Sequence, residues 1–331
     1  MLQTALAGII YAGFSFYLYQ PYLRNFGRWQ YLLVLNVFVA SLGCFFLSRR
    51  WVSGFLCSLF AGAVYGFGPF MLGLSKFHPT AGSLAAIVPW LFCPAAFIGK
   101  NRRLWVGLSL SVLPFLAILV FFNVSAHFRL FPMPVQTSLH PRDLTGLFAP
   151  LVAITRPLTP LGFYHIPIAA LVMGFSMLLA ARRFGILAIV AIGAALALCK
   201  SFLGVSPIIW LALPTVCGAV IIGAGTQALL SAGPADKKWV LAGAGALASL
   251  SIVMLLLATK CFRIFAGLGK NAAEMFVSAA TMYILGAVAL AIVFLLARAK
   301  VRLQWLRQVV LGSAVAVDIF LGAQFIVDTI L

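Results

Sequence analysis

The stretch that decides the fold is MFVSAATMYILGAVALAIVFLLA, residues 275–297, a run without a charged side chain. About 20 consecutive apolar residues suffice for a helix that crosses the hydrocarbon core of a bilayer. Similar runs recur along the whole chain, in which 64% of residues are hydrophobic and only 8% are charged. Soluble domains typically contain roughly 25% charged residues. The sequence therefore predicts an integral membrane protein.

About eleven apolar segments predict an all-α fold, a polytopic transmembrane helix bundle that forms a single membrane domain over residues 1–331. The first is expected to be a retained span, because it lacks a charged leader and a cleavage site. Three segments, 82–99, 166–181 and 184–199, are short for a ~30 Å core and are expected to tilt or to cross only partly. The segments are 1–19, 30–48, 52–73, 82–99, 104–123, 166–181, 184–199, 204–231, 239–259, 275–297 and 308–330.

The net charge of +18 arises from 23 Lys and Arg against five acidic residues. More than half of the basic residues fall in turns that alternate crossing would place on one side of the membrane, so the positive-inside rule predicts a cytoplasmic N-terminus and an external C-terminus. This topological explanation argues against nucleic-acid binding. The residues are Arg49, Arg50, Lys100, Arg102, Arg103, Arg182, Arg183, Lys237, Lys238, Arg298, Lys300, Arg302 and Arg307.

One external segment, residues 124–165, differs from the other loops. Its six prolines exclude a long regular helix, and connections of this length are usually functional or disordered. Its aromatic and aliphatic residues argue against a solvated tail, so we expect it to lie at the membrane interface. The segment also contains three arginines and three of the four histidines, namely Arg129, Arg142, Arg156, His127, His140 and His165. The histidine spacings match no metal motif, and the six cysteines are scattered singly, so no metal site is predicted and no cofactor is implied.

Three stretches resemble a known family. They are FFLSRRWVSG (45–54) with FAGAVYGFGPF (60–70), His78-Pro79 and IVPWL (87–91); PRDLTGLFAP (141–150); and KSFLG (200–204) with IIWLALP (208–214). These patterns of small, aromatic and proline residues are similar to the YfhO-type branch of bacterial membrane proteins that have a GT-C glycosyltransferase fold. They are spread over residues 45–214, about half of the chain. Small residues at helix contacts are also common in membrane proteins of other folds.

The resemblance implies a GT-C-like scaffold for lipid-linked sugar transfer, located in the bacterial inner membrane. It also implies a catalytic acid in the first external loop, but residues 20–29 contain Arg24 and Arg28 and no carboxylate. Such a transferase needs a carboxylate as a base or to hold a divalent metal. The sequence therefore favours a degenerate, noncatalytic member over an active enzyme.

Candidate functional residues lie in two places. Within the long external segment, Arg129, His140, Arg142 and Arg156 are candidate ligands for a lipid phosphate such as polyprenyl phosphate, or they lie among lipid headgroups. Asp143 is a candidate base there, although a helix cap or an Arg partner is the simpler interpretation. In the last segment, Asp318 lies in mid-span, where an ionisable group indicates either a buried polar contact or a proton or ion role.

Three hypotheses follow. The leading one is a noncatalytic GT-C-like protein that acts as a subunit or scaffold of a larger membrane assembly, with membrane lipids and other membrane subunits as partners. The second is an active lipid-phosphate-dependent glycosyltransferase that uses residues 124–165, with Arg142 and His140 binding the phosphate and Asp143 as the base. The third is a small-solute transporter that depends on Asp318.

Overall fold

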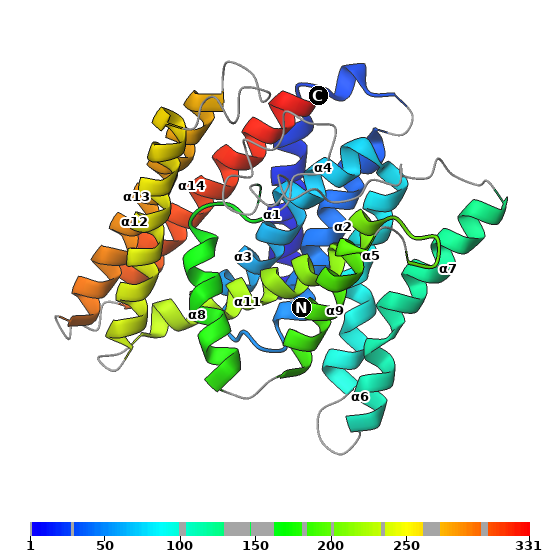
Figure 1. The fold of residues 1–331 in the computed structure, drawn as a ribbon, viewed down its shortest axis with the longest axis horizontal. Helices are drawn as coiled ribbons and strands as arrows, with labels where there is room; N and C mark the ends of the chain where they lie inside the picture. The colour runs from blue at the N-terminus through cyan, green and yellow to red at the C-terminus, as the bar shows by residue number, and fades with distance from the viewer. Residues whose placement is uncertain are drawn as a thin grey trace.

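The computed structural model describes most of the chain as a helical bundle (Figure 1). Within the described ranges every regular element is a helix, apart from an isolated bridge between Phe202 and Val205, so the predicted all-α fold class is confirmed. The described residues are 2–27, 30–98, 104–128, 146, 162–180, 184–199, 202–232, 236–260, 272–298 and 304–331. Their helices are α1 Leu2–Tyr19, η1 Leu23–Asn25, α2 Tyr31–Ser48, α3 Phe55–Gly66, α4 Pro69–Phe77, α5 Pro79–Ile98, α6 Leu104–Ser111, α7 Leu113–Phe128, α8 Pro167–Ala180, α9 Phe184–Leu198, α10 Pro207–Trp210, α11 Ala212–Ser231, α12 Lys237–Lys260, α13 Ala272–Arg298 and α14 Gln304–Ile330.

Nine of these helical stretches, counted within the described residues, are long and apolar enough to cross a membrane. Two predicted segments form the shorter apolar helices α8 and α9, as their lengths indicated. The fourth segment was predicted to be short, and this expectation is wrong. Helix α5 begins at Pro79, before the apolar run, and reaches 20 residues. Proline suits the first position of a helix because no helical hydrogen bond needs its missing N–H there.

Prolines and a helix break leave backbone carbonyls without their helical partners, and a neighbouring helix donates a hydrogen bond to one of them. Pro89 lies inside α5 and cannot donate to the carbonyl of Ala85. The Tyr65 hydroxyl of α3 donates to that carbonyl at 2.7 Å. A second break, at Phe67 and Gly68, separates α3 from α4, which begins at Pro69. In lipid such freed carbonyls need partners from within the protein.

Helix α11 is the most buried long helix, and it packs against α8, α3, α9, α2 and α5. Small residues permit this close packing. A Cβ atom on Gly225 would lie 2.7 Å from the carbonyl carbon of Ala170 and 2.9 Å from the backbone nitrogen of Gly174, both in α8. The two backbones therefore touch where α11 and α8 cross, as is common for glycines in membrane helices.

Hydrogen bonds gather several helix ends at one end of the bundle, which we call the basic face. Arg49 Nη2 donates to Gln3 Oε1 at 3.0 Å, and Arg49 Nη1 donates to the Ser53 carbonyl at 2.7 Å. The backbone N–H of Ser53 donates to Gln227 Oε1 at 2.8 Å. These contacts join the start of α1, the end of α2 and the end of α11, as the alternating topology predicts.

Arg307 of α14 extends the same face. Its Nη1 donates to the Ala232 carbonyl at 2.8 Å, and its Nη2 donates to the Leu296 carbonyl at 3.2 Å. The end of α13, the start of α14 and the end of α11 therefore lie together. Arg307 therefore contacts Ala232, the residue after α11, whereas Arg49 is linked to α11 through Ser53, which binds Gln227.

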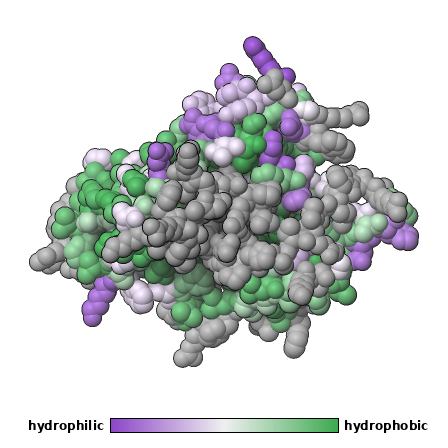
Figure 2. All heavy atoms as spheres, turned by 45° about the horizontal axis from the view of Figure 1, so that its top comes forward, coloured by the Kyte–Doolittle hydropathy of each residue, from purple (hydrophilic) through white to green (hydrophobic). Residues whose placement is uncertain are grey.

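The far ends of α1 and α14 meet at the opposite end of the bundle. The Tyr22 hydroxyl donates to Asp328 Oδ1 at 2.7 Å, and this hydrogen bond to a carboxylate raises the pKa of Tyr22, with smaller contributions from partial burial and from the carboxylate charge. Between the two ends the surface is apolar (Figure 2). The outer side of α13, for example, exposes Val277, Ile284, Leu285, Val288, Ile292 and Leu295. Such an exterior fits lipid or a neighbouring membrane helix.

Replacing Gly225 by Ala is expected to lower the stability of the folded protein by about 1–3 kcal/mol, because backbone atoms of α8 cannot yield as a flexible side chain can. The matched control is Gly245→Ala on α12, where an added Cβ atom meets nothing within 4 Å. The melting temperatures of both variants can be measured in mild detergent by monitoring thermal unfolding with circular dichroism. Equal melting temperatures for the two variants would contradict the close contact of α8 with α11.

Candidate functional site

The strongest cluster of buried polar contacts involves residues 164–166, just before α8. The chain turns at Gly162, whose φ of 110° is accessible to glycine at little cost. It then runs without helical structure to Pro167, where α8 begins (Figure 1). Asp318, which this segment contacts, lies near the middle of α14. Residues 164–166 are buried inside the bundle. The interfacial position expected for segment 124–165 stays a prediction, because most of that segment lies outside the described residues.

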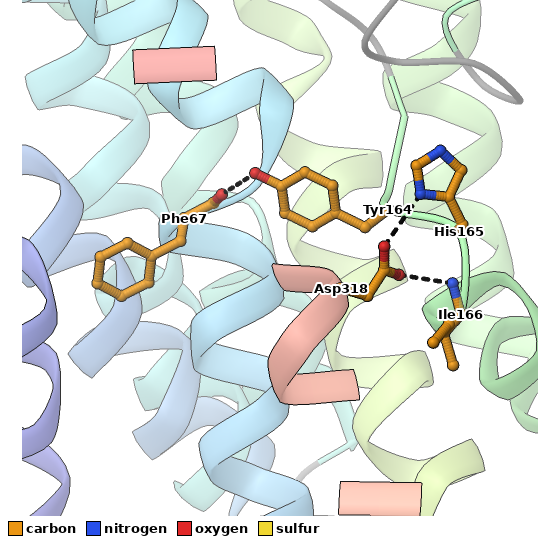
Figure 3. Close-up of polar contacts among 5 residues, drawn as sticks. All are labelled: Phe67, Tyr164, His165, Ile166 and Asp318. Carbon is orange, nitrogen blue, oxygen red and sulfur yellow. Dashed lines mark hydrogen bonds and ion pairs between the residues drawn. The ribbon is translucent and has the colours of Figure 1, made fainter. Parts of the chain in front are cut away.

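Asp318 accepts two hydrogen bonds from this segment (Figure 3). The backbone N–H of Ile166 donates to Oδ2 at 2.7 Å, and His165 Nδ1 lies 3.0 Å from Oδ1. The exposed fractions are 0% for Asp318 and 1% for His165. With an ionised carboxylate, Nδ1 carries the hydrogen and donates it. Hydrogen bonds of this kind, with one charged partner, are among the stronger ones in proteins.

The His165 ring is fixed by packing as well as by this hydrogen bond. It contacts Tyr283 of α13 edge to face, with ring centroids 4.9 Å apart and an interplanar angle of 89°. Its second nitrogen, Nε2, points away from Asp318 (Figure 3) and is buried without a hydrogen-bond partner among the described residues. Two helices, α13 and α14, therefore determine the orientation of this imidazole.

The two sequence neighbours of His165, Tyr164 and Ile166, are also fixed by contacts with surrounding helices. The Tyr164 hydroxyl donates to the Phe67 carbonyl at 2.6 Å, at the break between α3 and α4 (Figure 3). The Tyr164 ring lies against Gly322, where a Cβ atom would meet ring carbon Cδ1 at 2.6 Å. The Ile166 side chain similarly occupies the space beside Gly286 of α13, where a Cβ atom would lie 2.9 Å from Cγ1. Helices α3, α13 and α14 thus converge on three consecutive residues, which we call the Tyr164–Ile166 anchor.

This geometry favours an anchoring role for Asp318. Both of its carboxylate oxygens are occupied by groups of the same chain, and non-helical backbone inside a membrane protein needs such internal partners. The apolar pocket of the bundle is lined by other residues and does not reach Asp318. The arrangement can hold the end of segment 124–165 in a fixed place.

The sequence left two interpretations of Asp318 open, a buried polar contact and a proton or ion role. The structure pairs Asp318 with His165, which precedes α8 and had been grouped with the other histidines of the long segment. The pairing joins residues 153 positions apart, and no sequence pattern indicated it. The available signal was that Asp318 is an isolated acid in an apolar segment, so it needed a partner.

The other candidate residues cannot be placed in this cluster. Arg129, His140, Arg142, Asp143 and Arg156 lie outside the described residues. Within the described ranges, no three His, Cys, Asp or Glu side chains come together in a way that could hold a metal ion. Glu274 lies in the first turn of α13, as expected for an acid near a span end.

Comparisons with known proteins add no assignment. No family model, no curated protein and no solved structure matches this chain.

Asp318→Leu is expected to destabilise the folded protein by about 2–4 kcal/mol, because it leaves the Ile166 N–H and the His165 ring nitrogen buried without partners. Asp318→Asn should have a small effect, since its Oδ1 accepts from Ile166 and its amide donates to the other tautomer of His165. The melting temperature in detergent measures both variants.

Asp328→Leu is the matched control, because it makes the same replacement at an exposed acid of the same helix. We expect it to change the melting temperature much less than Asp318→Leu. Equal losses at the two positions would show that burial of Asp318 does not govern stability.

Proposed function

We propose that this chain is a noncatalytic membrane scaffold, a subunit of a larger membrane assembly, whose bundle positions segment 124–165 for contact with a partner. The observation that carries the proposal is the double hydrogen bond from the Tyr164–Ile166 anchor to Asp318. An ionisable group in the interior of a membrane protein is costly to bury. Here that group is used to fix the end of the longest external segment.

The exterior of the bundle supports the same proposal. Exposed apolar side chains are spread along the outer sides of α12, α13 and α14. Helices in a membrane associate through packing and polar contacts rather than by expelling water, so such surfaces suit either lipid or helices of other subunits. The sequence resembles GT-C proteins but lacks the acid expected in the first external loop, which is consistent with a role that needs no sugar transfer.

The transporter hypothesis is less well supported by the same contacts. A carrier group must bind and release its ion or proton, and it needs a route to water. Asp318 is completely buried and its two oxygens are engaged by Ile166 and His165. We therefore propose a structural role for Asp318.

The decisive experiment is gentle purification of the tagged chain from its native membrane, with native gel electrophoresis and mass spectrometry of what accompanies it. A defined partner should co-purify with the unmodified chain and with Asp318→Asn, and should be reduced at least about tenfold with Asp318→Leu, because loss of the anchor displaces segment 124–165. Gel filtration shows whether each variant is still folded.

Asp143→Asn separates this proposal from the enzyme hypothesis. A scaffold should retain its partner when Asp143 is neutralised, whereas a transferase that uses Asp143 as its base should lose sugar transfer. Purification of the chain alone, without any stoichiometric partner, would contradict the scaffold proposal. So would sugar transfer by the purified chain that Asp143→Asn abolishes.

We further propose that the protein lies in a bacterial inner membrane with its basic face toward the cytoplasm, as the positive-inside rule favours. A reporter enzyme that is active only outside the cytoplasm should then be active when fused after Leu331 and inactive when fused after Lys238. The reverse pattern would contradict this orientation while leaving the fold unchanged.

A further inference from the structure

An apolar pocket opens on the side of the bundle, away from the Tyr164–Ile166 anchor. Its volume is about 450 Å³, which falls within the usual range of roughly 300–1,000 Å³ for ligand pockets. Helices α2, α5, α6, α7, α9 and α11 contribute to its wall. Its lining side chains include Leu47, Trp51, Phe92, Phe115, Ile189 and Val220.

The pocket is elongated from the basic face toward the middle of the bundle. Leu47 is one residue from the end of α2, and Gly185 is the second residue of α9, so both belong to the basic face. From Gly185 to Ile192 the pocket follows α9 for about 10 Å at 1.5 Å per residue. Leu108 and Ile192 line it while each remains 50% exposed, so it opens sideways toward lipid.

Arg50 lies at the end of the pocket on the basic face. Its Nε donates to the carbonyl of Ala96 at 2.8 Å, and both Ala96 and the adjacent Trp51 line the pocket. This hydrogen bond holds the side chain beside the opening. Among the described residues, the hydrogen bond recorded for this side chain is the one from Nε. A planar guanidinium group matches the geometry of a phosphate, to which its remaining N–H groups can donate two parallel hydrogen bonds.

In the sequence, the turns that precede two of the lining helices contain basic residues and no acidic ones. Lys100, Arg102 and Arg103 directly precede α6, and Arg182 and Arg183 directly precede α9, two helices that line the pocket from their first turns onward. None of the acidic residues lies in the lining helices or in these turns. The five acids are Asp143, Asp236, Glu274, Asp318 and Asp328. Basic residues near the membrane surface attract anionic lipids.

We propose that this pocket binds an anionic glycerophospholipid, with one acyl chain along α9 and the phosphate at Arg50. The apolar wall suits the acyl chain, the sideways opening allows entry from the bilayer, and the basic end selects a negatively charged headgroup. This inference is independent of the scaffold proposal, because it concerns a different surface of the bundle.

Native mass spectrometry of the full chain in mild detergent tests the proposal by titration with three probes. They are phosphatidylglycerol, phosphatidylcholine with the same acyl chains, and glycerol phosphate without chains. Phosphatidylglycerol should bind about tenfold more tightly than phosphatidylcholine, and glycerol phosphate should not bind measurably, since the site needs both the phosphate and a chain.

Two pairs of variants locate the site. Ala188→Phe fills the pocket and should weaken phosphatidylglycerol binding at least about tenfold, whereas Ala191→Phe, on the same helix but outside the lining, should leave it unchanged. Arg50→Gln should reduce phosphatidylglycerol binding to the level of phosphatidylcholine. Lys238→Gln removes one charge from an exposed position on the basic face that does not line the pocket, and it should preserve the preference.

Three results would overturn the proposal. Equal binding of the two phospholipids by the unmodified chain would exclude selection of an anionic headgroup. Equal effects of Ala188→Phe and Ala191→Phe would show that the pocket is not the site. Glycerol phosphate binding as tight as that of phosphatidylglycerol would show a phosphate site that needs no acyl chain. Circular dichroism confirms that all four variants are folded.

Discussion

The two hydrogen bonds accepted by Asp318 allow a non-helical stretch of backbone to lie inside a bundle that is otherwise helical. A backbone N–H without a partner in the membrane interior is costly, and the segment before α8 has no helical partner for the N–H of Ile166. Asp318 supplies that partner from the middle of α14 and also orients His165. The last helix of the chain therefore determines how the segment that ends the long external loop enters the bundle.

Other features of the interior depend on this arrangement. Helix α8 starts next to the middle of α14, so its 14 residues have only part of the bundle to cross, which accounts for its short length. The break between α3 and α4 leaves the Phe67 carbonyl for Tyr164. Gly322 and Gly286 leave room for the side chains of Tyr164 and Ile166. The glycines and the helix break thus leave room for residues 164–166 inside the bundle. Larger side chains and unbroken helices would fill that space.

The two ends of the bundle differ in chemistry, and so do the surfaces proposed for function. The basic face holds Arg49, Arg50 and Arg307 in contact with helix ends, and the lateral pocket begins there. The Tyr164–Ile166 anchor is set deeper in the bundle and uses the buried carboxylate of α14. A scaffold with a lipid at one end and a partner at the other would keep these two interactions separate.

The sequence by itself indicated the membrane environment, the helical fold class and the approximate positions of the described spans. The length of an apolar run can be read directly from the sequence. In lipid such a run forms a helix, because its backbone groups must hydrogen-bond to one another. It also identified Asp318 as an isolated acid that needed a partner. The early start of α5 was missed because Pro79 and the polar Thr80 extend the helix beyond its apolar run. Only the tertiary structure paired Asp318 with His165 and Ile166, and only it brought Arg50 beside a pocket formed by six helices. These contacts join residues far apart in the chain, and they depend on how the helices pack, which hydrophobic periodicity does not encode.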